Sequence, residues 1–548
     1  MLRPEKIPEV PAETARIARA AFPKGSPFIR LRDELGIFLT DSDFSALYPH
    51  RGQPAAAPWR LMLISVMQFV ENLTDRQAAD AVRGHLAWKY ALSLELDDPG
   101  IDASVLCEFR ARLLEVSEPL AWLDRFLTLC EEKQLLKRHG KQRTDSTHVL
   151  GAIRVLNRLE LITECMRAAL NALATIAPDW LREVAVDEWY DRYAHRSENY
   201  RLPKSESGKQ FYANQVGQDG QKLLELLEKK GAPEGGLNLE EVQALKKCWH
   251  RQFIMERNVL RFRMRVELEK DRPMQLESPY DTEVRYSTKR GREWRGYKVH
   301  LTETCDDDLP HLVTHVATTT AEVQDAPLGS QVQNSLFARD LAPIEHYVDA
   351  GYNASDLIVS AREKHGTEII GPVRLNNAWT ARQEGAFTFQ DFQVDWENRK
   401  VVCPNGAVSE RWNTAKRSSG QPINVVAFPK ETCSTCAVRE RCIRSGDRPK
   451  SLTFQPQAQQ EALLKARDAM KDPQAQQRYH RRAGIESTIS QGVRAFGIRN
   501  CRYRGLKKTH LQHVLTALAF NVVRICEWLG GHRPQGTRLS RFAALRAA

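Results

Sequence analysis

The spacing of hydrophobic residues divides the chain into a helical first part and a mixed remainder. Between residues 27 and 138, apolar side chains recur every three or four positions, as in helices that bury one face. In the run PWRLMLISVMQFVENL, Leu61, Ile64, Met67 and Phe69 form such a face. We therefore predict an all-α N-terminal domain over residues 27–138. A bundle with Arg, Lys and aromatic residues between its helices suits DNA binding, and an ordinary helical bundle is the alternative.

After residue 138, short β-branched runs alternate with helical stretches, which predicts a mixed α/β fold. The predicted strands are KQRTDSTHVL, EVRYSTK, RGYKVHLTET, HLVTHVATTT, IEHYVDAG and TEIIGPVR. They belong to one domain, residues 139–530, which is interrupted twice. A helical insertion occupies about residues 153–275, and a cysteine-rich insertion occupies about residues 375–475. The ends of the chain are predicted to be a loose arm, residues 1–26, and a basic tail, residues 531–548.

One late segment, HLQHVLTALAFNVVRICEWLGG, is apolar enough to be a buried helix but too polar to cross a membrane. Leu511, Leu515, Leu518, Val522 and Ile525 fall at helical spacing, so we predict a core helix. No stretch of the chain reaches 18 apolar residues, and the first residues lack the apolar segment of an export signal. We therefore expect a protein of the cytoplasm with no membrane partner.

The net charge of the chain indicates what kind of partner it binds but says little about its fold. The 548 residues carry a formal net charge of +11, and the sequence pI is about 9.1. Such a basic balance favours binding to nucleic acid or another polyanion, although many basic proteins bind neither.

The cysteines suggest a metal site. There are 11, an odd number, and without an export signal they favour reduced thiols or a metal over disulfides. Cys403, Cys433, Cys436 and Cys442 cluster in sequence and include one C-x2-C pair. Four thiolates of this kind suit a tetrahedral structural Zn²⁺. Reduced thiols without a metal are the alternative.

Two aspartates stand where strands could bring them together. Asp145 lies in the first predicted strand, and Asp349 ends the run IEHYVD. In open α/β sheets, ligands gather at the carboxyl ends of strands. Converging carboxylates can hold two Mg²⁺ roughly 3.5–4 Å apart, because hard cations prefer oxygen ligands. Alternatively, both residues are ordinary turn and strand-end acids.

The most basic stretch, RYHRRAGIESTISQGVRAFGIRNCRYRGLKK, holds nine Lys or Arg residues and a single acid, Glu486. Tyr479, Arg482 and Glu486 are spaced by three and four residues, which places all three on one face of a helix. Such a face could present a metal-binding carboxylate with phosphate-binding groups beside it. A surface Arg–Glu pair, worth only about 0.3–0.5 kcal/mol, is the alternative.

Beyond these patterns, the chain resembles bacterial insertion-sequence transposases of the DDE class, in the branch marked by a Tyr-Arg-Glu signature. The matching pieces are TDSTHV, VDAGY and the basic stretch with the apolar segment after it. Tyr479, Arg482 and Glu486 fit the spacing of the signature. The family often carries a Lys seven residues after the Glu; here that position is Val493, with Arg494 next to it.

The resemblance implies an RNase H-like catalytic core in which Asp145, Asp349 and Glu486 hold two Mg²⁺ or Mn²⁺ ions. It implies metal-dependent cleavage of the ends of the protein's own insertion sequence and strand transfer into target DNA. The implied partners are double-stranded DNA, both terminal inverted repeats and target, and a second copy in a homodimer at the nucleoid. Side chains expected to contact DNA phosphates are Tyr479, Arg482, Arg478, Arg481, Arg494, Arg499, Arg502, Arg504, Lys507 and Lys508.

Two other functions remain open at this point. A transposase-derived protein could bind DNA without cutting it, but the presence of all three carboxylates favours an enzyme. An RNase H-like nuclease would cut without joining, and only a strand-transfer assay separates it from a transposase.

Overall fold

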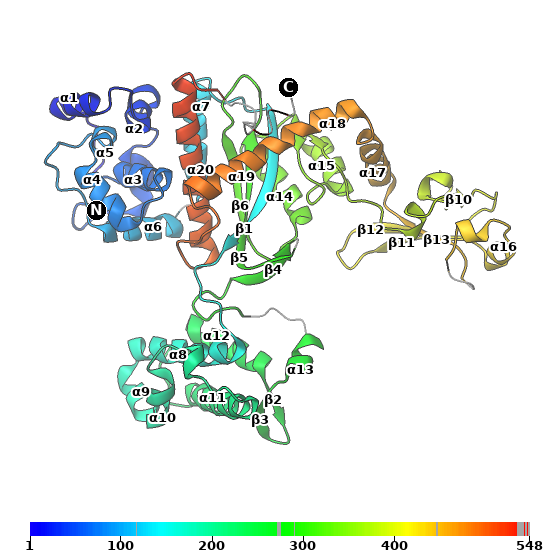
Figure 1. Cartoon of the computed structure of the whole chain (residues 1–548), viewed down its shortest axis with the longest axis horizontal. Coiled ribbons are helices and arrows are strands. Elements are labelled where there is room, and N and C mark those ends of the chain that lie inside the picture. Colours follow the sequence, from blue (N-terminus) through cyan, green and yellow to red (C-terminus); the bar gives the residue numbers. More distant parts are fainter. Residues whose placement is uncertain are drawn as a thin grey trace.

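The computed structural model shows a central α/β body with three further parts attached to it (Figure 1). The N-terminal helices lie on one side of this body, and a small β-rich part extends from the opposite side. The helical insertion lies below the body in the same view. The predicted basic tail, residues 531–548, falls mostly outside the described residues. The structure describes residues 1–116, 118–270, 276–289, 291–444, 448–533, 542 and 545.

The helices predicted for the N-terminal part are present, and they bury the predicted face. Leu61, Ile64, Met67 and Phe69 are each at most 2% exposed. Helix α4 begins with a capping box, in which the side chains and backbone of Thr74 and Gln77 exchange hydrogen bonds. The helices are α2 (Pro27–Arg30), α3 (Pro58–Val70), α4 (Asp75–Gly84), α5 (Leu86–Ala91), α6 (Ala103–Val116) and α7 (Leu120–Glu132).

The first 26 residues are not the loose arm that we predicted. Residues Ala12–Ala21 form helix α1, which packs on α5. Thr14 and Ala18 are fully buried, and the Thr14 hydroxyl donates to the Leu94 carbonyl oxygen at 2.9 Å. The small side chains of this segment allow it to approach its neighbours closely, so a stretch of low hydrophobicity is still held in place.

Six strands of the described chain form the central sheet, and they confirm the prediction of one mixed sheet. Strand β5 has β1 antiparallel along one edge and β4 and β6 antiparallel along the other. Beyond β1, β7 and then β8 run parallel to it. The strands are β1 (Lys141–Leu150), β4 (Arg285–Lys289), β5 (Arg292–Thr304), β6 (Val313–Thr320), β7 (Glu345–Tyr347) and β8 (Glu368–Ile370).

Helix α20 (Leu506–Leu529) joins the N-terminal helices to the sheet (Figure 1). It packs on β6 and on α3, and its predicted core positions from Leu511 to Ile525 are each at most 1% exposed. One hydrophobic core therefore runs from the N-terminal helices into the sheet, so the boundary predicted at residue 138 is not a gap in the packing. No helix of the described residues, α20 included, is long and apolar enough to cross a membrane.

The remaining helices of the body follow the sheet strands. They are α14 (Asp325–Ala338), α15 (Ser355–His365), α17 (Gln457–Ala469), α18 (Pro473–Tyr479), the 3-10 turn η8 (His480–Ala483) and α19 (Gly484–Ala495). Helices α18 and α19 run across the front of the sheet in Figure 1, so they bring the basic stretch against it.

The insertion after β1 has a hydrophobic core of its own. We predicted that it is helical, but it also contains a two-stranded hairpin. Its chain turns back at Arg257 and Asn258, which both have positive φ, and this allows a tight hairpin without glycine. Its elements are α8 (Arg158–Ile176), α9 (Pro178–Val184), α10 (Asp187–Tyr193), α11 (Glu206–Leu227), α12 (Glu240–Gln252), β2 (Phe253–Glu256), β3 (Val259–Phe262) and α13 (Arg265–Lys270).

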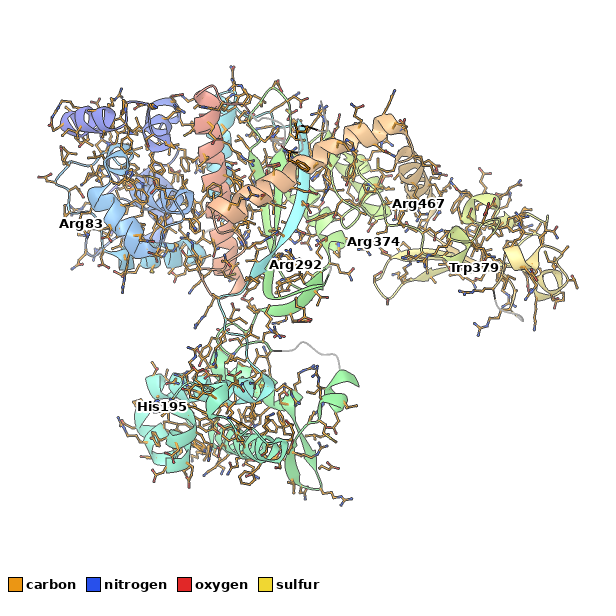
Figure 2. All side chains as sticks on the ribbon, in the orientation of Figure 1. Arg83, His195, Arg292, Arg374, Trp379 and Arg467 are labelled. Atoms are coloured by element: carbon orange, nitrogen blue, oxygen red, sulfur yellow. The ribbon has the colours of Figure 1, made fainter. Side chains whose placement is uncertain are left out.

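The cysteine-rich insertion forms the small β-rich part, with a core of aromatic and aliphatic residues around Phe428. Where it meets the body, the guanidinium of Arg467 donates to the Arg374 carbonyl oxygen at 3.4 Å, and Figure 2 labels both residues at this joint. Its elements are β9 (Gln393–Asp395), β10 (Lys400–Val402), β11 (Arg411–Lys416), β12 (Pro422–Ala427), α16 (Lys430–Ser434) and β13 (Ser451–Phe454).

A buried carboxylate on β5 fastens α19 and α20 to the sheet. Glu303 is 0% exposed and accepts from Arg143 of β1, Arg524 of α20 and Thr488 of α19, each at 2.7 Å. Burial alone would raise the pKa of Glu303, but Arg524 and Arg143 outweigh burial and hold this pKa below its ordinary value. Four elements are therefore joined through one side chain, which we call the Glu303 hub.

We expect Glu303→Ala to destabilise the central body by about 3–5 kcal/mol, because it leaves two buried guanidinium groups without their counter-charge. Calorimetry of the unfolding transition measures this. Asp307→Ala is the matched control, since Asp307 pairs with Arg481 but is 80% exposed, and it should cost less than about 1 kcal/mol. Equal effects of the two substitutions would contradict the role of the hub.

Candidate active site

Asp145 sits on β1, opposite Leu301 of β5, and is only 9% exposed. One carboxylate oxygen accepts from the Ser146 amide at 2.8 Å. Burial raises the pKa of Asp145 to about 6, although the guanidinium of Arg482 opposes this rise; the charge of Asp349 adds to it. Two carboxylates therefore act on each other here, as a site for a cation requires.

Asp349 lies two residues beyond β7, slightly later than the strand end that we predicted. Its Oδ1 accepts from the backbone amides of Gly351 at 2.8 Å and Tyr352 at 3.3 Å, which fixes the carboxylate in the turn. A Cβ on Gly351 would stand 2.9 Å from the same oxygen. Residue 351 thus needs to be glycine for the turn to close around Asp349.

The sequence predicted that Tyr479, Arg482 and Glu486 lie on one face of a single helix. In the structure the helix is interrupted between them. α18 ends at Tyr479, the 3-10 turn η8 follows, and α19 starts at Gly484. The guanidinium of Arg143 lies at this break, and its Nη1 donates at 2.7 Å to the Arg481 carbonyl oxygen, which also accepts from the Gly484 amide in the 3-10 turn. The same guanidinium would stand 2.0 Å from a Cβ on Gly484, so only glycine fits there.

Arg482 links the two carboxylates that are furthest apart in sequence. Its Nη2 bonds to Asp145 Oδ2 at 2.7 Å, and its Nη1 bonds to Glu486 Oε1 at 3.0 Å. The Arg482 side chain is 15% exposed, whereas that of Glu486 is 64% exposed. One carboxylate is therefore held inside the site and the other stands at its mouth.

Tyr479 packs beside this group, against Tyr347 and Ile370. Burial raises the pKa of Tyr479 to about 12, with Arg482 opposing the rise and the charges of Asp349, Asp145 and Glu486 adding to it. The phenol therefore stays protonated and can donate a hydrogen bond. Each of the three carboxylates therefore lies within electrostatic reach of the Tyr479 phenol.

A divalent metal fits the chemistry of this group but needs a rearrangement. The three carboxylates offer only oxygen donors, which suit Mg²⁺ or Mn²⁺. Within the described ranges, however, no three His, Cys, Asp or Glu side chains stand close enough to hold a metal as they are. The cation between Asp145 and Glu486 is the guanidinium of Arg482, so this side chain has to turn away before a metal can bind both.

A fourth acid lies near the turn, and sequence reasoning missed it. Asp325, at the start of α14, has a carboxylate oxygen 3.3 Å from the position of a Cβ on Gly351. It lies 3.4 Å from the ammonium of Lys298 on β5. Only its place in the first turn of a helix marks Asp325 in the sequence, and many acids share that position. The Glu303 hub was equally invisible, because its partners lie far apart in the chain.

Most basic residues predicted to contact DNA are engaged by other parts of the protein. Arg478 pairs with Glu368 and Arg481 pairs with Asp307, each at 2.6 Å. Arg499 and Arg502 bond to neighbouring polar groups. Arg504 is exposed and lies over the Tyr280 ring, with no hydrogen-bond or ion-pair partner among the described residues. Arg494, Lys507 and Lys508 are exposed and have no bonded partner in the part of the chain that the structure describes.

The four clustered cysteines meet in the β-rich part. N–H donors reach the sulfurs of Cys403, Cys433 and Cys436 at 3.3–3.6 Å. Burial raises the pKa of the Cys442 thiol; Lys450 opposes this rise, and the other three cysteines add to it, so each of them lies within electrostatic reach of Cys442. They are not in ligating geometry, since the described residues contain no group of three metal-ligating side chains.

Two family models match the chain. The model described as Transposase DDE domain matches residues 402–526, which include the cysteine cluster, Glu486 and most of α20. The model described as Transposase domain (DUF772) matches residues 17–112, within the N-terminal helices. A search of curated proteins finds no match. Both matches are to transposase domains, and together they point to an insertion-sequence DDE transposase.

Proposed function

We propose that this transposase cuts the ends of its own insertion sequence and joins them to target DNA, as a member of the Tyr-Arg-Glu branch. The observation that carries the proposal is the arginine bridge between Asp145 and Glu486, with Asp349 and Tyr479 beside it. Arg482 and Asp145 are 337 positions apart in sequence. Tyr479, Arg482 and Glu486 have the spacing of the signature. A chance surface pair does not bring such distant acids together.

The sheet supports an RNase H-like core. Without the short edge strand β4, the strands lie in the spatial order β6, β5, β1, β7, β8. In chain order these are the third, second, first, fourth and fifth strands, and the second, β5, is antiparallel to both of its neighbours. Asp145 lies on the first of these strands, and Asp349 follows the fourth. The first and fourth are parallel neighbours, so the two aspartates face a common region of the sheet.

In the proposed site, Asp145, Asp349 and Glu486 would hold two Mg²⁺ or Mn²⁺ ions. When bound, such ions activate a water or a 3′-hydroxyl and stabilise the leaving oxygen. Released from the carboxylates, Arg482 can present two parallel N–H groups to a DNA phosphate. The Tyr479 hydroxyl can donate to another phosphate oxygen. The Glu303 hub keeps α19 in place while Arg482 exchanges partners.

Synapsis of two DNA ends is expected to require two copies of the chain, so we propose a homodimer that works at the nucleoid. The exposed Arg494, Lys507 and Lys508 are the best candidates for contact with DNA near α19 and α20, because their charges are not used within the described protein.

We expect Glu486→Gln to abolish cleavage and to leave DNA binding within about twofold, because the amide keeps the shape of the carboxylate but not its charge for a metal. Labelled duplexes that carry the ends of the encoding element are incubated with each protein, with Mg²⁺ or with EDTA. Joining to a second duplex is scored in the same reactions.

Each outcome of this assay separates the candidate functions. Metal-dependent cutting and joining by the wild type alone supports the transposase. Binding without cutting in any metal would favour an inactive derivative, and cutting without joining would favour a nuclease. Equal loss of binding and cutting in Glu486→Gln would contradict the role of Glu486.

A second test concerns the arginine bridge. Arg482→Gln removes the cation that competes with metals for Asp145 and Glu486, so we expect the apparent Mn²⁺ affinity without DNA to rise roughly tenfold. Isothermal titration measures this. Arg481→Gln is the matched control, because Arg481 is the neighbouring residue and pairs with Asp307 instead. An unchanged Mn²⁺ affinity in Arg482→Gln would show that the bridge does not guard the metal site.

We also propose that the four cysteines hold a structural Zn²⁺. N–H groups donate to the sulfurs of Cys403, Cys433 and Cys436, and Cys403, Cys433 and Cys442 pack against one small core. Binding would draw them together by a local adjustment of the loops that carry them.

Protein purified in metal-free buffer is expected to contain close to one Zn per chain by elemental analysis. Cys436→Ser should lower both the zinc content and the melting temperature, because metal binding contributes to folding. Cys107→Ser is the control, since Cys107 is exposed and lies far from the cluster in sequence. Less than about 0.2 Zn per wild-type chain would remove the proposal.

A further inference from the structure

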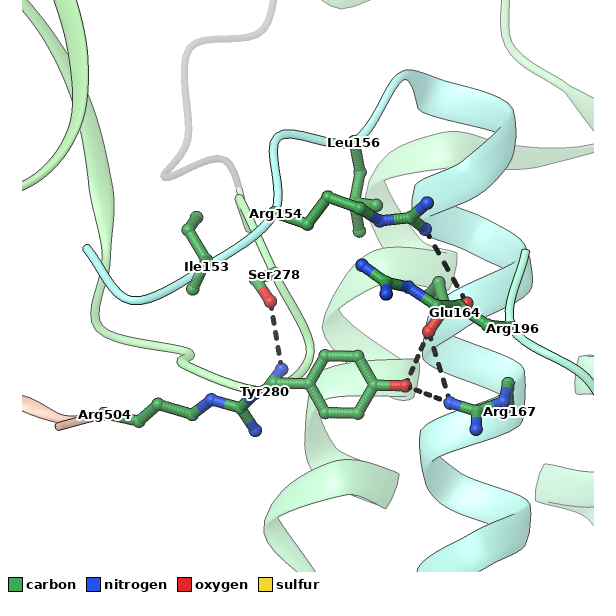
Figure 3. Close-up of a pocket in the computed structure, with 9 residues that line it drawn as sticks. All are labelled: Ile153, Arg154, Leu156, Glu164, Arg167, Arg196, Ser278, Tyr280 and Arg504. Atoms are coloured by element: carbon green, nitrogen blue, oxygen red, sulfur yellow. Dashed lines mark hydrogen bonds and ion pairs between the residues drawn. The ribbon is translucent and has the colours of Figure 1, made fainter. Parts of the chain in front are cut away.

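A cavity of about 320 Å³ opens where the helical insertion joins the central body (Figure 3). Both linkers of the insertion line it, at Arg154 and at Tyr280. Helix α8 contributes Arg167, and the loop before α20 contributes Arg504. The cavity is therefore built by the insertion and the body together.

The lining is strongly basic. Four arginines surround it, and among the described residues that line it Glu164 is the one carboxylate. Figure 3 shows that Arg154, Arg167, Arg196 and Arg504 come from four different segments and gather around Glu164 and the ring of Tyr280. Segments so distant in sequence form this cluster only in the folded protein.

The acceptors of the cavity are already used. Glu164 is 1% exposed and accepts from the Ser197 amide at 2.6 Å and the Tyr280 hydroxyl at 2.5 Å. Arg167 donates to the same hydroxyl at 2.7 Å and lies 3.5 Å from Glu164. Because its carboxylate is satisfied from several sides, the cavity offers little to a cation or another donor.

The donors, in contrast, are only partly used. Arg154 is occupied by the Ser197 carbonyl oxygen, by Glu160 and Glu198 outside the cavity, and by Glu164 at 3.8 Å. The Nε of Arg167 is buried with no hydrogen-bond partner in the described protein. Arg196 comes no closer than 3.7 Å to Glu198, and Arg504 lies over the Tyr280 ring at 5.3 Å without a carboxylate partner among the described residues. The unused capacity belongs to guanidinium groups, which suit a tetrahedral oxyanion.

We propose that this cavity binds one phosphodiester group of the DNA backbone, away from the bond that is cut. The inference rests on the proposed function for the identity of the ligand. From Asp145 to Leu150, β1 spans about 16 Å, and the cavity begins beyond Leu150. At about 3.4 Å per nucleotide, the bound phosphate lies roughly five or more nucleotides from the cleavage site. Arg504 would hold it from the body and Arg196 from the insertion, so DNA would fasten the two parts together.

The test is a scan with methylphosphonate linkages, which remove the charge of one phosphate at a time. Duplexes carrying an end of the encoding element are bound in EDTA, so that no cleavage is needed for the readout. For the wild type, we expect one linkage about five or more nucleotides from the cut to weaken binding about tenfold. Arg504→Gln and Arg196→Gln should each weaken binding to unmodified DNA, also by about tenfold. In these variants the methylphosphonate at that linkage should cause no further loss of binding, because the side chain that contacts the phosphate is already absent.

Arg201→Gln is the matched control, because Arg201 is exposed on the same insertion but does not line the cavity. It should keep the full methylphosphonate penalty. A flat scan for the wild type, or a penalty that survives in Arg504→Gln, would overturn the inference even if the enzyme cuts DNA. Failure of cleavage with an intact scan would instead overturn the proposed function alone.

Free phosphate compounds provide the last arm. Inorganic phosphate and AMP are titrated separately into the wild type and Arg504→Gln. A flat scan combined with micromolar AMP binding that Arg504→Gln abolishes would show a nucleotide site and overturn the assignment to DNA. Millimolar or weaker binding of both compounds is the expected result for a single backbone phosphate.

Discussion

The geometry of the candidate active site depends on the burial of one carboxylate, Glu303, between two guanidinium groups. An uncompensated charge in this position would be expelled from the core, so β1, β5, α19 and α20 have to meet where the charges balance. Arg143 then uses its other donors on the Arg481 carbonyl oxygen and on His311. The arginine that pairs with Glu303 therefore also bonds to the 3-10 turn η8, which carries Arg482.

The parts of this arrangement that depend on neighbouring residues could be predicted from the sequence. Alternating β-branched residues marked β1, helical spacing marked α20, and the four-residue offset placed Arg482 near Glu486. The hairpin of the insertion was missed, because its turn uses Arg257 and Asn258 instead of glycine. α1 was missed because its small side chains carry little hydrophobic signal, although they pack well.

What could not be predicted depends on contacts across the fold. Arg482 meets Asp145 from 337 positions away, and nothing near either residue reveals the pairing. The number of basic residues in the stretch also overestimated the charge available to DNA, because contacts across the fold neutralise some of them. Arg478 and Arg481 add to the net charge of the sequence, yet carboxylates of the body already neutralise them. Surface potential near α19 is therefore set by fewer cations than the basic stretch contains.

The shared core around α20 holds the N-terminal helices and the sheet in a fixed arrangement. Arg502, just before this helix, bonds to Leu73 and Asn72 of the N-terminal part and lies over the ring of Phe69. The N-terminal helices and the sheet thus cannot change their separation without breaking buried contacts. If the N-terminal helices bind DNA, as the sequence predicts, this rigidity would fix the number of base pairs between the bound segment and the cut.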